Sequence, residues 1–419
     1  MNVIFISIGM PDLSSGKEDF YADLLRELAK KDVSLTVIAP SLDDKFVGLR
    51  REGLFRVLRV PLKPFQGDYP FIIKGVRIIQ MTAKYKKAYK KYIDKEKFDY
   101  VMMATPPSSL VDVVSLIKKE SSARFYLLLR DIHPECLDRK VVPINIKNRT
   151  DVYDECKHPY GVNWFVEKLL YKQSQALYKI ADMVGCMSPG NQKFFKKIAP
   201  YVNDNINVLL PNWYKGKEIT STNNDELREK YGLKNKYIAI FGGTIGEAQA
   251  VWNIASLAKH NLDKKNVIFL IVGRGVKKKI LEKMAIEDHL DNMRFLEYMP
   301  REDYERILEI ADVGLISIDE KYKVPTCPSK IIGYMALAKP VIAMFNKGND
   351  YGTYYIDKPR CGLYSTDLDY KKMYENFDKL YYDEGLRKEL GQNGYNYYKE
   401  YLTAEAVSNL LINQLQSAI

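Results

Sequence analysis

The segment Val324–Lys330 carries the residues whose types and spacing best suit the binding of an anion. It reads Val-Pro-Thr-Cys-Pro-Ser-Lys and runs into the apolar stretch Ile331–Ala336, which predicts a helix from Pro328. Proline suits the first helical position because it lacks the N–H that would have no partner there. The free N–H groups that follow, the Ser329 hydroxyl and the Lys330 ammonium would then converge on one anion. The alternative is a structural turn with Lys330 in solvent.

Two glycine-rich segments follow predicted strands in the same half of the chain. Gly242–Gly243–Thr244–Ile245–Gly246 comes after the apolar run Tyr237–Phe241, and Gly273–Arg274–Gly275 comes after Val267–Val272. Glycines at the end of a parallel strand let backbone N–H groups approach a phosphate, and Arg274 would suit a diphosphate. Strand-to-helix turns that bind nothing would explain the same residues, so both interpretations remain open.

The elements that must position these residues follow one pattern along the whole chain. Apolar, β-branched runs alternate with amphipathic helical patterns, which is typical of parallel sheets built from βαβ units. The predicted strands are Val3–Ser7, Ser34–Ala39, Phe55–Val60, Tyr100–Ala104, Phe125–Leu129, Met183–Met187, Val208–Leu210, Tyr237–Phe241, Val267–Val272, Arg294–Leu296, Val313–Ser317 and Val341–Met344. The predicted helices are Phe20–Lys30, Ile72–Lys91, Ser109–Lys119, Trp164–Ile180, Val251–Lys259, Val276–Ala285, Arg301–Ala311, Pro328–Leu337 and Ala404–Ser417.

The 419 residues exceed the usual size of one hydrophobic core, so two domains are expected. A polar stretch from Lys215 to Asp225 resembles a linker. The prediction is therefore an α/β chain with two tandem Rossmann-like, doubly wound domains that face a central cleft. They span residues 1–214 and 215–395, and residues 396–419 form a C-terminal helix that could pack back on the N-terminal domain. Ligands of such sheets bind at the carboxyl ends of the strands.

Composition limits the class of protein. The five cysteines, Cys136, Cys156, Cys186, Cys327 and Cys361, show no CxxC spacing, which argues against a zinc site or a disulfide framework and fits a reducing compartment. No apolar run is long enough for a membrane span. We therefore expect a cytoplasmic protein without a structural metal.

The formal net charge of +11 calls for an anionic partner. Nucleic acid has little support because no zinc finger, RNA-recognition signature or basic heptad segment is present. The densest positive stretch, Lys74–Lys97, has tyrosines at helical spacing and predicts a basic amphipathic helix. Its aromatic stripe could pack on the core, or the helix could lie against anionic lipid headgroups at the inner face of the cell membrane.

Taken in order, eight segments resemble the family 4 glycosyltransferases, which have the GT-B fold. The similarity is nearest to the bacterial branch that builds capsule, exopolysaccharide or O-antigen repeats on a lipid carrier. The segments are Gly16–Lys17, Leu129–Glu135, Met187–Asn191, Leu210–Trp213, Phe241–Thr244, Ala311–Leu315, Pro328–Lys330 and Lys339–Ile342.

This resemblance implies transfer of a sugar from a nucleotide-diphosphate sugar, with a UDP-sugar expected, to a polyprenyl-diphosphate-linked glycan. It implies retention of the anomeric configuration, no cofactor and no required metal. The implied catalytic residues are Arg130, Asp131 and His133, and the implied acceptor-binding residues are Gly16 and Lys17. The implied donor-binding residues are Gly242, Gly243, Thr244, Glu247, Arg274, Tyr298, Thr326, Cys327, Ser329 and Lys330.

The sequence departs from the family pattern at four positions. Pro325 and Gly333 stand where the family commonly has two glutamates, Glu247 where a basic residue is usual, and Arg130 where a histidine is frequent. These changes motivate an alternative, in which the chain is a catalytically degenerate subunit that assembles with a partner transferase. A nucleotide-sugar epimerase with the same two-domain fold is a third possibility, although the resemblance extends to acceptor-side segments.

Overall fold

The computed structural model describes residues 1–41, 46–62, 71–132, 161–216, 224–246, 248–319, 322 and 324–417, with only the backbone for 71–79 and 161–167. The chain divides into two compact units. The N-terminal unit is Met1–Pro211 with Val407–Ile419, and the C-terminal unit is Asn212–Ala406. The division thus falls at Asn212 rather than 215, and the segment that returns to the first unit starts at Val407 rather than 396.

Within the described residues, the N-terminal unit has an eight-stranded sheet in the order β3-β4-β2-β1-β5-β6-β7-β8. Only the β3–β4 pair is antiparallel, and every other pair is parallel. The strands are β1 (Asn2–Ile6), β2 (Ser34–Pro40), β3 (Gly48–Glu52), β4 (Phe55–Val60), β5 (Tyr100–Ala104), β6 (Arg124–Leu129), β7 (Met183–Cys186) and β8 (Asn207–Leu209). The continuous burial of most strands is what a sheet covered on both faces requires.

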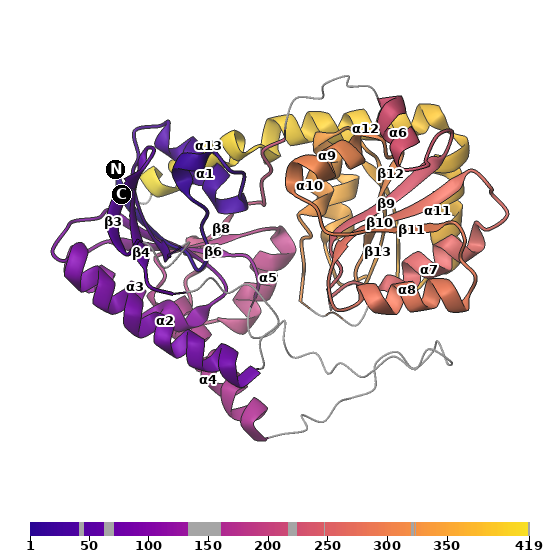
Figure 1. The fold of residues 1–419 in the computed structure, drawn as a ribbon. Coiled ribbons are helices and arrows are strands. Elements are labelled where there is room, and N and C mark those ends of the chain that lie inside the picture. The colour runs from indigo at the N-terminus through magenta and orange to yellow at the C-terminus, as the bar shows by residue number, and fades with distance from the viewer. Residues whose placement is uncertain are drawn as a thin grey trace. The chain divides into compact units, whose positions relative to one another are not determined.

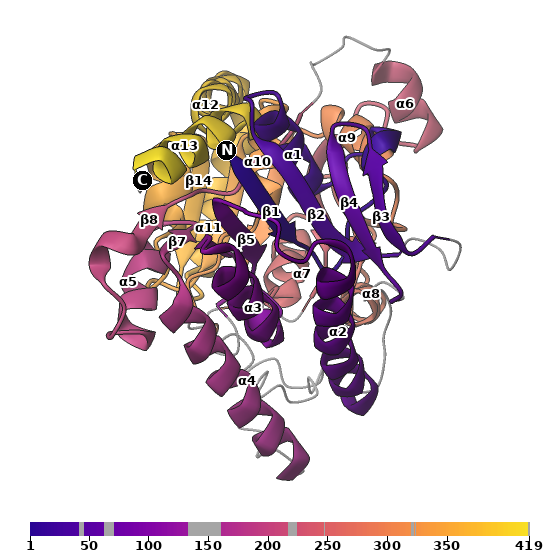
Figure 2. The same cartoon turned by 90° about the vertical axis from the view of Figure 1, so that its left-hand side faces the viewer.

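Helices cover both faces of this sheet. They are α1 (Phe20–Ala29), α2 (Phe71–Tyr92), α3 (Val111–Ser121), α4 (Gly161–Ile180), α5 (Pro189–Ile198) and, from Val407 on, α13 (Ala404–Ser417). Figures 1 and 2 show α1 and α13 on one face and α2, α3 and α4 on the other. Two buried tyrosine hydroxyls anchor α13, since Tyr100 Oη donates to the Leu415 carbonyl (2.5 Å) and Tyr126 Oη to Gln414 Oε1 (2.6 Å).

The aromatic stripe of the basic helix α2 packs on the core. Tyr85 and Tyr89 are fully buried, and Tyr85 Oη donates to the Ser7 carbonyl at 2.7 Å. The exposed face of α2 carries Lys84, Lys87 and Lys90. No helix among the described residues is both long and apolar enough to cross a bilayer.

The C-terminal unit has a six-stranded parallel sheet in the order β11-β10-β9-β12-β13-β14, again counted over the described residues. Its strands are β9 (Tyr237–Thr244), β10 (Val267–Arg274), β11 (Met293–Leu296), β12 (Val313–Ser317), β13 (Val341–Phe345) and β14 (Gly362–Thr366). Its helices are α6 (Asn224–Lys230), α7 (Val251–His260), α8 (Lys278–Glu287), α9 (Arg301–Glu309), α10 (Lys330–Ala336), α11 (Tyr370–Tyr382) and α12 (Glu384–Tyr397).

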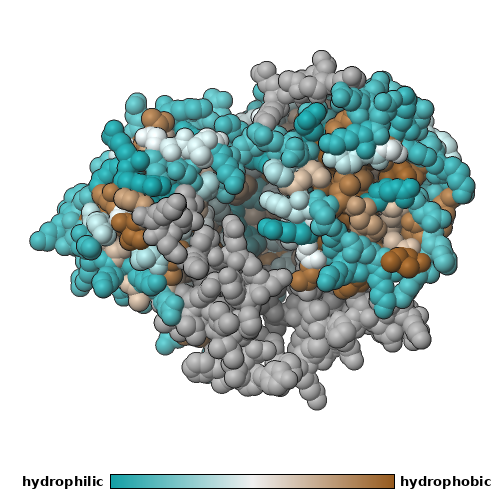
Figure 3. All heavy atoms as spheres, in the orientation of Figure 1, coloured by the Kyte–Doolittle hydropathy of each residue, from teal (hydrophilic) through white to brown (hydrophobic). Residues whose placement is uncertain are grey.

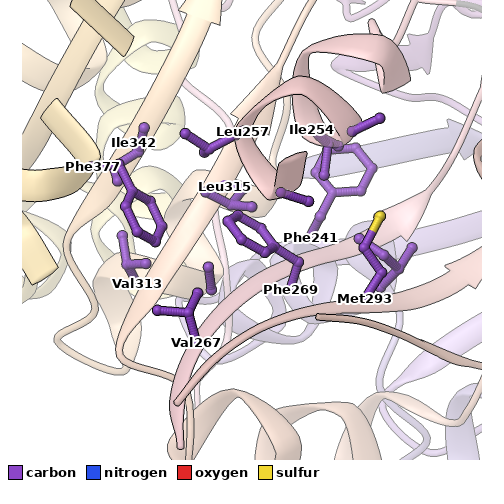
Figure 4. Packing of buried hydrophobic residues seen from close by; sticks show 14 of the residues in the cluster. Phe241, Ile254, Leu257, Val267, Phe269, Met293, Val313, Leu315, Ile342 and Phe377 are labelled. Carbon is purple, nitrogen blue, oxygen red and sulfur yellow. The ribbon is translucent and has the colours of Figure 1, made fainter. Parts of the chain in front are cut away.

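The core of this unit lies where α7, α8 and α11 cover one face of the sheet. Figure 4 shows Phe241, Phe269 and Leu315 from three adjacent strands meeting Ile254 of α7 and Phe377 of α11. On the face drawn in Figure 3, most residues are hydrophilic, and small groups of hydrophobic residues lie among them.

The predicted strands and helices are present, and six strands and α-helices that were not predicted join them. These are the edge strands β3 and β14 and the helices α5, α6, α11 and α12, of which α6 occupies part of the predicted linker. The prediction that Pro328 begins a helix is wrong, because α10 begins at Lys330 with Ser329 as its N-cap.

Candidate functional site

The candidate donor site lies at the point where the C-terminal sheet changes direction. The chain goes from β9 outward to β10 and β11, and then crosses back to β12 on the other side of β9. Ligands of open α/β sheets bind at such a switch point, at the carboxyl ends of the strands. β9 and β12 pair only at Val313–Ala239 and Gly314–Ile240, so their carboxyl ends diverge beyond Ile240.

A buried tyrosine from α10 fills the split between these two strands. Tyr334 Oη lies 3.3 Å from the carbonyl oxygens of both Ile240 and Leu315 and accepts a hydrogen bond from Gly242 N at 3.4 Å. A Cβ at Gly314 would lie 2.4 Å from the Tyr334 ring, so glycine is required there for the ring to fit. The hydroxyl therefore binds the end of β9 to the end of β12.

The predicted glycine turn is in fact a pair of strand ends. Gly243 pairs with Gly273 and Thr244 with Arg274 in the parallel ladder between β9 and β10, and the turn comes only after Thr244. Gly273 has φ +138°, and a Cβ there would lie 2.0 Å from the Gly243 carbonyl oxygen. The glycines thus allow close approach of two backbones, and the exposed Gly243 and Thr244 end the sheet at its carboxyl edge.

Gly242 makes room for a second tyrosine. A Cβ built at Gly242 would lie 1.8 Å from Tyr304 Oη and within 2.5 Å of two of its ring carbons. The Tyr304 side chain comes from α9, so this helix packs against the very end of β9. Gly242 was predicted to let a phosphate approach, but the structure requires a glycine there because the Tyr304 side chain packs against it.

Lys330 lies next to the end of β9. Its Nζ donates to Gln249 Oε1 at 3.2 Å and lies 4.0 Å from the centre of the Phe241 ring. Burial lowers the pKa of the Lys330 ammonium to about 7. The side chain is thus directed toward the switch point, as the sequence predicted, and it is close to losing its proton at neutral pH.

A second lysine, which the sequence analysis did not single out, meets the same glutamine. Lys277 is 2% exposed. Its Nζ donates to the Gln249 carbonyl oxygen at 3.1 Å and lies 4.0 Å from Asp319 Oδ2. Two ammonium groups from different loops therefore converge on Gln249. In the sequence, Lys277 is one of three adjacent lysines, but its position just after Gly275 at a strand end could have identified it.

Arg274 and Tyr298, which were predicted separately, lie together. The guanidinium carbon of Arg274 is 4.2 Å from the centre of the Tyr298 ring, and Tyr298 is 58% exposed. A stacked guanidinium and ring at the edge of a sheet offer a flat surface and a positive charge to a ligand.

The remaining predicted donor residues differ in accessibility. Cys327 is buried, and its carbonyl oxygen accepts from Asn212 Nδ2 at 3.1 Å, so it has a structural contact. Thr326 is partly exposed and Ser329 is exposed, and the Ser329 side chain makes no capping hydrogen bond. Glu247 lies outside the described residues.

In the N-terminal unit, Arg130 and Asp131 follow the carboxyl end of β6. Arg130 is buried, its backbone N–H donates to Thr105 Oγ1 (3.1 Å) and its Nη1 to the Leu210 carbonyl (2.8 Å). Asp131 is exposed, and His133 lies outside the described residues. Gly16 has φ +68°, and Gly16 and Lys17 are exposed after β1. Among the described residues no group of three or more His, Cys, Asp or Glu side chains could hold a metal ion.

Comparison with known proteins agrees with this architecture. Residues 223–397 match the family of glycosyl transferases group 1. The chain is 23% identical over 315 residues to a probable glycosyltransferase of Pseudomonas aeruginosa, WbjE, a match that covers 74% of this chain and 70% of that protein. It is 31% identical over 134 residues to the putative colanic acid biosynthesis glycosyl transferase WcaI of Escherichia coli, which covers 31% and 33% of the two chains.

Solved structures share the fold across the whole chain. The sucrose-phosphate synthase of Thermosynechococcus elongatus superposes with a TM-score of 0.73 at 14% identity, covering 100% of both chains. Anabaena HepE, solved in complex with UDP, superposes with a TM-score of 0.62 at 11% identity and the same coverage. The chain thus has the fold of the GT-B glycosyltransferases, with two mostly parallel Rossmann-like sheets, and its residues 223–397 are similar to the glycosyl transferases of group 1.

Proposed function

We propose that this chain transfers a sugar from a UDP-sugar to a glycan acceptor during the synthesis of a surface polysaccharide. The observation that carries the proposal is the convergence of Lys277 and Lys330 on Gln249, at the switch point of a group 1 glycosyltransferase domain. The names of WcaI (colanic acid biosynthesis) and of the HepE complex with UDP support the polysaccharide product and the donor.

The chemistry asks for positive charge at the leaving group. As the bond from the anomeric carbon to the diphosphate oxygen breaks, negative charge grows on the diphosphate, and fixed cations stabilise it most where water is excluded. Lys330 and the buried Lys277 are suited to this task, and the stacked Arg274 and Tyr298 offer a surface for the base. An oxygen of the departing diphosphate can take the acceptor's proton, which would give retention without a protein base or a metal ion.

The acceptor side of the proposal rests on the sequence resemblance. We place the acceptor hydroxyl near Arg130 and Asp131 and propose that the acceptor glycan is linked to a polyprenyl diphosphate. The lysines on the exposed face of α2 would then hold the enzyme at the cytoplasmic face of an anionic membrane, where each basic residue contributes about 1 kcal/mol. Because Tyr85 and Tyr89 are buried in the core, charge alone would make this contact.

One observation favours the alternative of a degenerate assembly subunit. A Cβ at Gly333 would lie 3.7 Å from the Tyr214 ring, so this ring occupies the direction in which a side chain at 333 would leave the helix. Gly333 stands where the resemblance implies a glutamate, and a side chain longer than that of alanine would have to pass the Tyr214 ring. A subunit that no longer turns over a donor would show such a loss.

A donor screen tests both functions. The purified chain is heated with UDP-, GDP-, dTDP- and ADP-linked sugars, and release of the free nucleoside diphosphate is then measured with the donor that raises the melting temperature. We expect a shift with one UDP-sugar, and Lys330→Met to abolish it while the control Lys279→Met, which changes an exposed lysine, keeps it. No shift with any donor would refute the transferase proposal and favour the assembly subunit.

The depressed pKa of Lys330 gives an independent readout of the same contact. A diphosphate beside the amine favours its charged form, so binding at pH 8 should draw a proton from the buffer. Calorimetric titration in two buffers of different ionisation enthalpy measures that uptake. We expect the wild type to take up a proton as the donor binds, and binding without proton uptake would remove Lys330 from the site.

A further inference from the structure

The N-terminal unit contains a cavity of about 650 Å³ that the proposed function does not use. It lies at the amino ends of β6, β7 and β8, and residues from the end of α4, the segment before β8 and the end of α13 also line it. Figure 2 shows where these elements lie in the N-terminal unit. Small-molecule sites in proteins have volumes of roughly 300–1,000 Å³. This cavity therefore has the size of a ligand site.

The cavity is remote from the predicted catalytic residues of its unit. Arg124, which lines it, is the first residue of β6, and Arg130 follows the last. Six residues of extended chain separate them, or about 20 Å at the rise of a β-strand. A ligand in this cavity would thus occupy a second site, at the opposite edge of the sheet.

The lining has more positive than negative charge available to a ligand. Arg124 and Lys179 line the cavity, and among the described lining residues Asp182 is the one that carries a carboxylate. That carboxylate is already engaged, since its Oδ2 accepts from Lys118 Nζ at 2.5 Å and from the Phe125 N–H at 2.6 Å. Lys179 Nζ lies 5.2 Å from the centre of the Tyr201 ring, and among the described residues no carboxylate forms an ion pair with Lys179 or Arg124.

The rest of the lining suits a sugar rather than a bare anion. Tyr201 is 47% exposed and presents a ring, and Asn203 and Asn205 contribute exposed amides. Aromatic rings stack against the C–H faces of sugars, amides bond their hydroxyl groups, and arginine pairs with carboxylates in a planar, two-point contact.

The wall of the cavity is held in place by hydrogen bonds. Gln414 of α13 accepts from Tyr126 Oη at 2.6 Å and donates to the Leu209 carbonyl at 2.8 Å, and both contacts tie the helix to the sheet. A site whose walls are already ordered loses less entropy when a ligand binds.

We propose that this cavity is an accessory binding site for an acidic saccharide, whose carboxylate meets Arg124 and Lys179 and whose ring lies on Tyr201. The site does not depend on the donor assignment, because binding can be measured without turnover. Such a site would hold a carboxylated glycan on the N-terminal unit at a distance from the sheet edge where transfer is proposed.

The test is a calorimetric titration of the full chain with a hyaluronan tetrasaccharide, which carries carboxylates, and with the neutral chitotetraose. We expect the acidic saccharide to bind at least fivefold more tightly, and the difference to shrink as salt rises. Arg124→Gln and Lys179→Gln should each weaken it at least fivefold, whereas Lys172→Gln, which changes an exposed lysine of α4 outside the cavity, should leave it unchanged.

Three outcomes would overturn the proposal. They are equal affinity for the two saccharides, no binding of either, and competition by inorganic phosphate at the concentration of the saccharide, which would mark a simple anion site. If Arg124→Gln lowers the melting temperature, Lys179→Gln carries the test, because the Lys179 side chain is exposed and contacts the Tyr201 ring at the surface. Unchanged affinity in a folded Lys179→Gln also counts against the site.

Discussion

Adding one methyl group at Gly242 should destabilise the C-terminal unit. The new Cβ would lie 1.8 Å from Tyr304 Oη and 2.4 and 2.5 Å from two ring carbons, far inside van der Waals contact. The ring must move, and it comes from α9, whose Ile307 and Leu308 are 1% exposed and hold the helix in place. Overpacking of this kind costs about 1–3 kcal/mol and sometimes more. We expect a loss of about 3 kcal/mol for Gly242→Ala.

Calorimetry measures this loss. The C-terminal unit contains 195 residues (212–406), and for that size 1 kcal/mol shifts the melting temperature by about 2–4 °C. The expected decrease for Gly242→Ala is therefore roughly 6–12 °C in the transition of that unit. Gly333→Ala is the matched control, since a Cβ there meets nothing closer than 3.7 Å. Alanine at this helical position should instead stabilise by about 0.5–1 kcal/mol.

A double mutant identifies the cause. Tyr304→Leu removes the hydroxyl and the ring carbons that the new Cβ would strike, so in that background Gly242→Ala should cost less than about 1 kcal/mol. Two results would contradict this prediction. Gly242→Ala could have the melting temperature of the wild type, or the substitution could lower the free energy of unfolding equally with tyrosine and with leucine at position 304. Either result would show that Tyr304 does not pack on the end of β9 as the structure has it.

Three further predictions concern buried polar groups. Burial lowers the pKa of Lys330 to about 7 in the folded chain, against about 10.4 in the unfolded chain. Burying the charged amine therefore lowers the free energy of unfolding by its full amount below pH 7, and this loss disappears as the pH rises toward 10.4. Lys330→Met should therefore raise the melting temperature at pH 6 and lose that advantage by pH 10. Arg59→Met should cost about 3–5 kcal/mol in urea unfolding, because the buried Glu52 loses its buried partner and keeps only Arg50 and the Leu13 N–H, and adding Glu52→Leu should restore much of the loss. Tyr334→Phe removes the hydrogen bonds of the hydroxyl between β9 and β12 and should lower the free energy of unfolding by about 1 kcal/mol. We expect the free energy of donor binding to fall by more than this.

The two strands that the sequence did not predict, β3 and β14, lie at the edges of their sheets. β3 reads Gly-Leu-Arg-Arg-Glu, with no alternating apolar pattern. It is held at the edge of the sheet by Glu52, whose two carboxylate oxygens accept from Arg59 Nε (2.8 Å) and Nη2 (2.6 Å) of β4. β14 is likewise an edge strand, and only one of its five residues is buried. A pattern of burial cannot mark strands that bury so little.

The candidate site was predicted in part. Lys330 was identified from its place at a predicted helix start and Arg274 from its place after a strand end. The structure directs Lys330 to the switch point and stacks Arg274 on Tyr298. Lys277 was missed because three adjacent lysines look alike in sequence, and only the fold buries Lys277 and Lys278 and brings Lys277 to Gln249. The roles assigned to these residues remain predictions until donor binding is measured.

The sequence by itself determined the alternation of strands and helices, because the spacing of its apolar residues follows the repeat of a buried strand or of an amphipathic helix. It also placed the glycines at the ends of predicted strands and Lys330 at the start of a predicted helix. Only the tertiary structure decided that β9 lies between β10 and β12. That order brings Gln249, Lys277 and Lys330 together although up to 81 residues separate them along the chain. It also makes Gly242 and Gly314 packing positions for two tyrosines, since the contacts that require a glycine come from α9 and α10 and have no local signature.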